Sequence, residues 1–197
     1  MRTDEQLAEL AKKVSAKTIE LNLTLNEELN SHLRTPGWLV SHPDIQNKIW
    51  RETAYLGCYV TQKKFSAGMS NIEMSKFTAL FRKEFMSSVI SKSFKLDPIA
   101  EEGAKLMIES DYDNKLKKYE AYQGRAAVLF KDEVQGYLTA QTRKTKMNEN
   151  ALGNEIMSKT GSLFGLAGKT APDSPIPDDT LISVGESAVR LFDAATI

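Results

Sequence analysis

Apolar residues recur at helical spacing along the first three quarters of the chain. Between residues 4 and 33 they return every three or four positions, and Leu7, Val14 and Leu21 lie one heptad apart. Because an α-helix has about 3.6 residues per turn, this spacing places the apolar side chains on one face of a long helix. Residues 18–25 also alternate as a strand would, but neither Pro nor Gly interrupts them, which favours the helix.

Helix-breaking and helix-capping residues divide the following part of the chain into further predicted helices. The stretch TPGWLVSHPD, the turn SAGMS and the pair Asp97–Pro98 combine residues that end a helix or begin a new one. With a last start expected at SDYDN, we predict helices over residues 44–65, 71–94, 98–110 and 111–146. The pattern predicts an all-α fold, an irregular antiparallel helical bundle of about five helices over residues 1–147.

The composition changes after Met147. Residues 148–179 are rich in Gly, Asn, Ser and Pro and end in PDSPIP, which is typical of a flexible linker. Residues 180–197 are then predicted to form a C-terminal amphipathic helix, with Asp178 or Asp179 as its N-cap. Such a short helix needs a surface to cover, so it docks on its own bundle or on a neighbour's. Its apolar stripe, which we predict to bind a protein partner or a second copy, consists of Leu181, Val184, Ala188, Leu191 and Phe192.

Charge is balanced overall but unevenly distributed. The chain holds 26 Lys and Arg and 26 Asp and Glu, so net charge gives no general argument for nucleic acid or a membrane surface. Residues 34–95, however, carry 10 basic against 4 acidic side chains, whereas residues 148–197 carry 3 against 7. A basic middle and an acidic tail could attract each other, although ordinary solvated charge is the simpler interpretation.

Part of the basic middle suggests an alternative function. The stretch KKFSAGMSNIEMSKF resembles the turn and second helix of a helix-turn-helix, with Gly68 in the turn and Met74 and Phe77 pointing inward. Ser70 and Glu73 would then belong to its recognition face, although a lysine stands where the first helix normally presents a small residue. The expected nucleic-acid contacts are Lys63, Lys64, Asn71, Lys76, Arg82, Lys83, Arg143, Lys144 and Lys146.

One stretch invites comparison with a phosphate-binding loop. The sequence GSLFGLAGKT ends in Gly-Lys-Thr, but a P-loop needs a glycine five residues before its second one, where this chain has Leu163. A P-loop also enters a helix, whereas this stretch continues into APDSPIP. The pattern therefore does not predict nucleotide binding.

The residues best suited to catalysis or metal binding are few and scattered. Cys58 is the only cysteine, so neither an intramolecular disulfide nor a zinc site with two or more cysteines is possible in one chain. His32 and His42 are the only histidines, and Cys58 lies within a predicted helix, away from a setting that would lower its pKa. We expect no catalytic residue, no metal and no cofactor.

These observations favour a non-enzymatic interaction protein such as an adaptor, scaffold or assembly subunit. It would act through its apolar helix faces and the tethered C-terminal helix, and a homo-oligomer is slightly preferred over a monomer. The alternative is a helical nucleic-acid-binding protein that uses the segment 63–83. No run approaches eighteen apolar residues, so we expect a cytoplasmic protein with no membrane contact.

Overall fold

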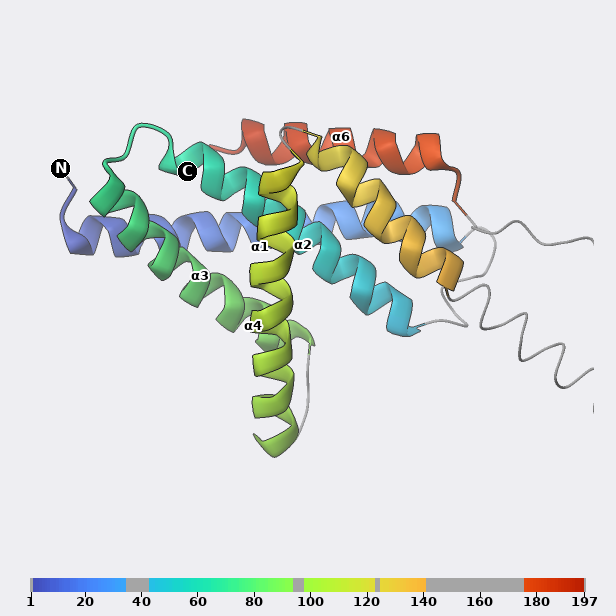
Figure 1. The fold of residues 1–197 in the computed structure, drawn as a ribbon, viewed down its shortest axis with the longest axis horizontal. Coiled ribbons are helices and arrows are strands. Elements are labelled where there is room, and N and C mark those ends of the chain that lie inside the picture. Colours follow the sequence, from blue (N-terminus) through green and yellow to red (C-terminus); the bar gives the residue numbers. More distant parts are fainter. Residues whose placement is uncertain (1, 35–42, 94–97, 123–124, 141–175, 197) are drawn as a thin grey trace, which may run out of the picture.

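The computed structural model describes residues 2–34, 43–93, 98–122, 125–140 and 176–196. Within these ranges the chain forms helices and no strand, which confirms the all-α prediction. In Figure 1, α1 and α6 lie lengthwise along the molecule and α4 stands across them, so the bundle is irregular. The helices are α1 (Asp4–Arg34), α2 (Pro43–Ser66), α3 (Asn71–Ser93), α4 (Pro98–Ala121), a helix over residues 126–140, and α6 (Asp178–Ala194).

The long helix α1 packs on both α2 and α3. Its contact face carries apolar residues and also a stripe of buried polar ones, which includes Thr18 and Asn26. The Thr18 hydroxyl lies 3.1 Å from the hydroxyl of Thr61, and the Asn26 amide donates to the hydroxyl of Thr53 at 2.8 Å. These partners on α2 explain why polar residues stand on the inner face of α1, where the sequence alone also resembled a strand.

The core of the bundle is rich in aromatic rings. On α3 the rings of Phe77, Phe81 and Phe85 stack in succession, with centroids 5.9 and 5.7 Å apart. The ring of Tyr112 on α4 continues this series, 5.9 Å from that of Phe85. All four side chains are buried, so the series joins α3 to α4 inside the molecule.

The predicted helix boundary at Ser110 is wrong. α4 continues through this residue to Ala121, and the described helical residues resume only at residue 126. Ile108 and Tyr112 are four residues apart, and both are buried against the bundle. This packing on either side of Ser110 outweighs the weak helix propensity of the Ser-Asp pair.

The last helix begins slightly earlier than the sequence suggests. Its N-cap is Pro177, without a side-chain hydrogen bond, and the predicted caps Asp178 and Asp179 lie in the first turn. Ile176 is buried, so the end of the predicted linker already belongs to the docked segment. The rest of that linker, residues 148–175, lies outside the described residues.

Candidate functional site

The predicted partner-binding stripe lies against its own chain. α6 packs on α1 and α2, and close to the helix over residues 126–140. The side chains of Leu181, Val184, Ala188 and Phe192 are buried there, and that of Leu191 is partly buried. In this single chain α6 docks on its own bundle. Whether the stripe also binds a partner stays a prediction.

Two glycines allow α6 to approach this closely. A Cβ added to Gly57 of α2 would lie only 2.3 Å from Cζ of Phe192, so the aromatic ring occupies the space of the missing side chain. A Cβ added to Gly185 of α6 would lie 3.0 Å from the backbone oxygen of Ala127. Gly57, which weakens α2 as a helix former, is therefore the residue that accommodates Phe192.

Two lysines of the bundle hold the ends of α6. The Lys64 ammonium donates to the backbone oxygens of Asp193 and Ala195, the latter at 2.8 Å. α6 has no basic residue in its own last turn, so Lys64 supplies the positive charge that a helix C-terminus favours. At the other end, the Lys131 ammonium lies 3.4 Å from the carboxylate of Asp178.

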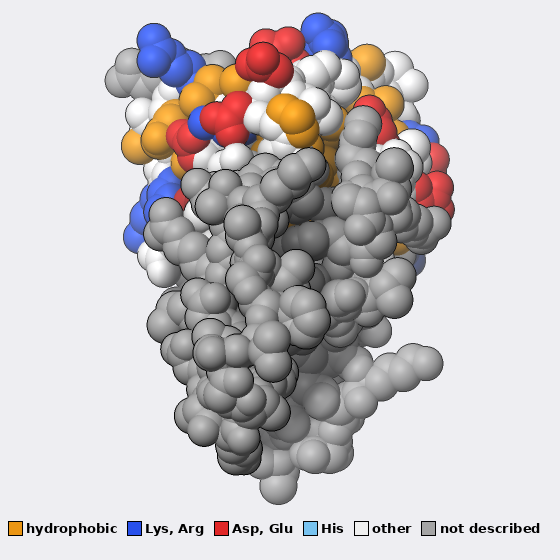
Figure 2. Space-filling model, turned by 90° about the vertical axis from the view of Figure 1, so that its right-hand side faces the viewer, with side chains coloured by type: hydrophobic (Ala, Val, Ile, Leu, Met, Phe, Trp, Pro, Cys, Tyr) orange, Lys and Arg blue, Asp and Glu red, His pale blue; other side chains and the backbone are white. Residues whose placement is uncertain are grey.

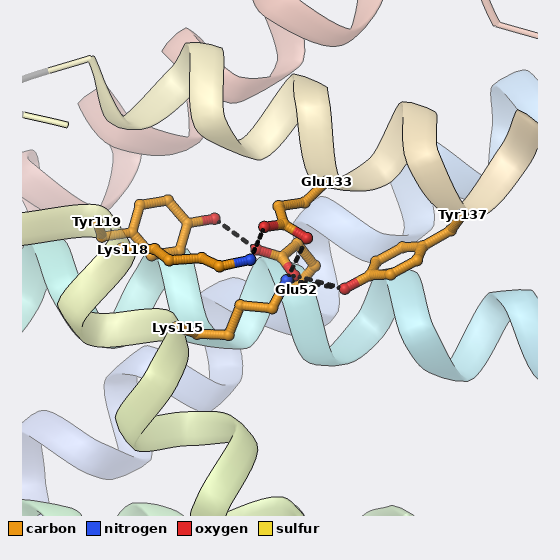
Figure 3. A network of polar contacts seen from close by, with 6 residues as sticks. All are labelled: Glu52, Lys115, Lys118, Tyr119, Glu133 and Tyr137. Carbon is orange, nitrogen blue, oxygen red and sulfur yellow. Dashed lines mark hydrogen bonds and ion pairs between the residues drawn. The ribbon is translucent and has the colours of Figure 1, made fainter. Parts of the chain in front are cut away.

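A network of polar side chains joins α2, α4 and the helix over residues 126–140 (Figure 3). It was not predicted from the sequence. Two of its pairs are four residues apart on one helix and so share a helix face, which is the only local signal that could have suggested it. Its members are Glu52, Lys115, Lys118, Tyr119, Glu133 and Tyr137.

Glu52 lies at the centre of this network, and its side chain is fully buried. Its Oε2 accepts hydrogen bonds from the Lys115 ammonium at 2.7 Å and from the Tyr137 hydroxyl at 2.9 Å. Its Oε1 accepts one from the Tyr119 hydroxyl at 2.8 Å. The Lys115 ammonium also pairs with Glu133 at 2.5 Å. Both oxygens of the carboxyl are thus occupied by groups of the protein itself.

The ionisation of these groups follows from burial and pairing. Burial raises the pKa of Glu52 and outweighs the charge and hydrogen bond of Lys115, which lower it. Burial alone would lower the pKa of Lys115, but the charge of Glu52 and the hydrogen bond to Glu133 raise it on balance. Burial likewise acts to raise the pKa of Glu133, yet hydrogen bonds from Lys115 and Lys118 bring it below its ordinary value. At neutral pH the Lys115–Glu133 pair is therefore charged.

This arrangement suits positioning better than chemistry. The Glu52 carboxyl is out of contact with solvent, and both of its oxygens accept hydrogen bonds from groups of the protein. What the network does is tie three helices together at one point. Because a buried charge without its partner costs several kcal/mol, these contacts fix the angle at which α4 crosses α2.

The residues predicted to contact nucleic acid are dispersed. The Lys76 ammonium pairs with Asp4 at 2.7 Å, the Arg82 guanidinium pairs with Asp113 at 2.9 Å, and Lys64 holds the end of α6. Three of the predicted phosphate or base contacts are thus engaged within the chain. Asn71, Lys63 and Lys83 are exposed. Arg143, Lys144 and Lys146 lie outside the described residues.

The helix-turn-helix-like segment has its turn where expected, but its predicted faces are partly wrong. Gly68 has a φ of 79°, in the region that favours glycine. Glu73, placed on the recognition face, is buried: it accepts hydrogen bonds from the Ser70 backbone and hydroxyl at 3.1 and 2.8 Å and from the backbone N–H of Arg2. Ser70 and Glu73 form a capping box that closes the start of α3. Met74, expected to point inward, is 40% exposed.

A hollow of about 640 Å³ lies between α2 and α3 beside this segment. Tyr59 and Lys63 line it from α2, Met74 and Ser75 from α3, and Glu120 from α4. The Tyr59 ring stacks on the buried ring of Tyr119, with the centroids 5.5 Å apart. A member of the polar network on α4 therefore supports the side of the hollow that Tyr59 forms. The hollow thus combines an aromatic ring and a thioether with one charge of each sign.

The remaining candidates for chemistry gain little from the structure. Cys58 is buried with its sulfur 3.0 Å from the hydroxyl of Tyr112, and burial raises the pKa of the thiol well above its usual range. Among the described residues no group of three or more His, Cys, Asp or Glu side chains could hold a metal ion. His42 and the GSLFGLAGKT stretch lie outside those residues, as does the side chain of His32.

Comparison with protein-family models, with curated proteins and with solved structures found no match. In the part of the chain that the structure describes, no helix is both long and apolar enough to cross a bilayer.

Proposed function

We propose that this chain is a non-enzymatic interaction protein, an adaptor, scaffold or assembly subunit, that binds a protein partner through its helix faces. The observation that carries the proposal is the α2–α3 hollow with exposed apolar side chains at α3. Met74 lines the hollow and is 40% exposed, and Ile72, one turn before Ser75, is 63% exposed. A flexible thioether in a concave surface, with a further exposed apolar side chain on the same helix, is typical of sites that receive another protein.

The polar interior supports the non-enzymatic part of the proposal. Among the described residues, the ionisable groups around the buried Glu52 form hydrogen bonds to one another. Catalysis requires such groups to reach a substrate. The reduced, buried thiol of Cys58 fits a cytoplasmic location, which is part of the same proposal.

The alternative, nucleic-acid binding, has weaker support. Lys64, Lys76 and Arg82 are engaged with other groups of the chain. Of the lysines in residues 63–83, Lys63 and Lys83 are exposed and are not part of these contacts. Figure 2 views the molecule from the right-hand side of Figure 1, away from the turn between α2 and α3, and the described surface there carries both basic and acidic side chains. Retention on a nucleic-acid column that falls steeply with salt, and is lost on changing Lys63 and Lys83 to Glu, would favour this alternative.

Site-specific photo-crosslinking tests the preferred function. A photo-reactive phenylalanine analogue replaces Ser75 at the hollow, and the matched control carries it at Ser87, an exposed serine on the same helix. In cells that express the chain, we expect a discrete protein adduct from position 75, a much weaker one from position 87, and loss of the first on adding Ile72→Glu. Equal labelling from both positions would contradict the proposal.

A further inference from the structure

The surface beneath α6 selects its occupant by shape. The Phe192 ring fits only because residue 57 has no side chain, and α6 lies close to Ala127 only because residue 185 has none. Phe192 and Gly185 are seven residues apart, so both features lie on one face of α6. The receiving groove, which we define by Gly57, Lys64, Ala127 and Lys131, therefore matches a small residue and an aromatic residue one heptad apart.

Charge complementarity also selects the direction in which a helix lies in the groove. Lys64 donates to the last carbonyl oxygens of α6, and Lys131 lies beside the acidic first turn at Asp178. A helix inserted in the reverse direction would place its positive end at Lys64 and lose both contacts. The groove therefore discriminates the direction of the helix as well as its side chains.

The covalent connection does not confine α6 to its own groove. From residue 141 to residue 175 the chain adds 175 − 140 = 35 residues between the two described parts. A chain of this length spans at most about 120 Å when fully extended. This length of chain allows the α6 of one copy to lie in the groove of another copy beside it.

We propose that the groove is a receptor for a separate helix, and that the α6 of a second copy occupies it whenever the chain's own α6 has left. The inference rests on the proposed function, since it names a second copy as one partner of an assembly subunit. The chain's own helix competes at an effective concentration of roughly millimolar. Exchange between copies is therefore expected when the groove of one copy has been vacated, and a closed monomer otherwise.

A complementation experiment with the full chain tests this inference. Gly57→Leu fills the space of Phe192 and blocks the groove while leaving α6 intact. Gly185→Val forces α6 away from the Ala127 backbone while leaving the groove intact. Each variant alone is expected to be a monomer with a displaced α6, and an equimolar mixture is expected to form a 1:1 heterodimer by light scattering. The double variant Gly57→Leu/Gly185→Val has neither an open groove nor a fitting α6, so mixing it with either single variant should give only monomers.

A second measurement covers the case in which Gly57→Leu fails to fold. A synthetic peptide of residues 176–196 is titrated into the Gly185→Val chain, with the same peptide carrying Gly185→Val as control. We expect saturable binding of one wild-type peptide per chain and at least tenfold weaker binding of the control. The inference would be overturned if the mixture of the two single variants contained only monomers and the Gly185→Val chain did not bind the wild-type peptide. The crosslinking at Ser75 reads out a different surface, so either proposal can fail without the other.

Discussion

The ring of Phe192 lies where a side chain on Gly57 would stand, since a Cβ at residue 57 would be 2.3 Å from the ring's Cζ. This contact joins residues that are 135 positions apart in the sequence (192 − 57 = 135). It explains a glycine in the interior of α2, where glycine costs about 1 kcal/mol relative to alanine. The cost is offset by burial of a complete aromatic side chain.

Gly57→Ala should therefore lower the free energy of unfolding, by about 1 kcal/mol, because overpacking exceeds the gain in helix propensity. Gly136→Ala is the matched control, since a Cβ there meets no atom within 4 Å. It should raise the free energy of unfolding by up to about 1 kcal/mol. Urea denaturation measures both. Stabilisation by both substitutions would show that Phe192 does not occupy this position.

Lys64→Met should loosen the end of α6, because the backbone oxygens of Asp193 and Ala195 lose their donor. We expect a loss of about 1 kcal/mol, the order of a hydrogen bond from a charged group that is partly exposed. Hydrogen exchange of the backbone amides at the end of α6 should become faster by a factor that corresponds to this loss of free energy. Lys63→Met, at the exposed neighbouring lysine, serves as the control, and equal effects of the two changes would argue against the anchor.

Lys115→Met should be among the most disruptive single changes in the chain. It leaves Glu52 and Glu133 without their shared ammonium, and an unpaired buried charge costs about 3–5 kcal/mol. Lys118→Met removes the other lysine that pairs with Glu133, but its side chain is 56% exposed, so it should cost no more than about 1 kcal/mol. Urea denaturation measures the loss in free energy of unfolding for both variants. Equal losses would contradict the conclusion that Lys115 is the main partner of the buried carboxyls.

The capping box at the start of α3 should be visible in the pH dependence of stability. Hydrogen bonds from the Arg2 backbone and from Ser70 lower the pKa of Glu73 from 4.5 to about 2. The stabilisation that this shift represents is present above pH 4.5 and is lost as the pH falls towards 2. The difference in unfolding free energy between wild type and Glu73→Gln should thus be largest near neutral pH and shrink across this window.

The control for this measurement is Glu120→Gln, at an exposed carboxylate outside the capping box. Between pH 6 and pH 3 the difference between wild type and Glu73→Gln should fall, and the Glu120→Gln series serves as the comparison for loss of a carboxylate elsewhere on the surface. A Glu73→Gln difference that stays constant over the same range would mean that the carboxylate is not held by the Ser70 and Arg2 donors.

The sequence predicts those parts of the fold that depend on neighbours along the chain. Helical spacing around Leu7 and the Asp97–Pro98 pair predict the starts of α1 and α4, and the apolar stripe predicts α6. The boundary at Ser110 fails because the packing of Tyr112 on Phe85 of α3 decides it, and periodicity does not report contacts with another helix. The Ser70–Glu73 capping box is a local signal in the sequence, but the same residues also fit the recognition face of a helix-turn-helix, and only the structure distinguishes the two.

Contacts between distant segments could not be predicted. Glu52, Lys115 and Glu133 come from three helices, and each one resembles an ordinary surface charge in its own segment. Only the fold brings them within hydrogen-bonding distance. Gly57 is similar, since a glycine in a helix indicates either a weak point or a close contact, and the position of Phe192 distinguishes the two.

The place of α6 in the fold is the claim on which the account depends, and removing the helix tests it most directly. The full chain is compared with a chain that ends at Met147, by light scattering and by circular dichroism, with and without the peptide of residues 176–196. The account predicts that the shortened chain is less stable than the full chain, and that the peptide binds to it and restores its stability. A shortened chain that is as stable as the full chain and does not bind the peptide would contradict it.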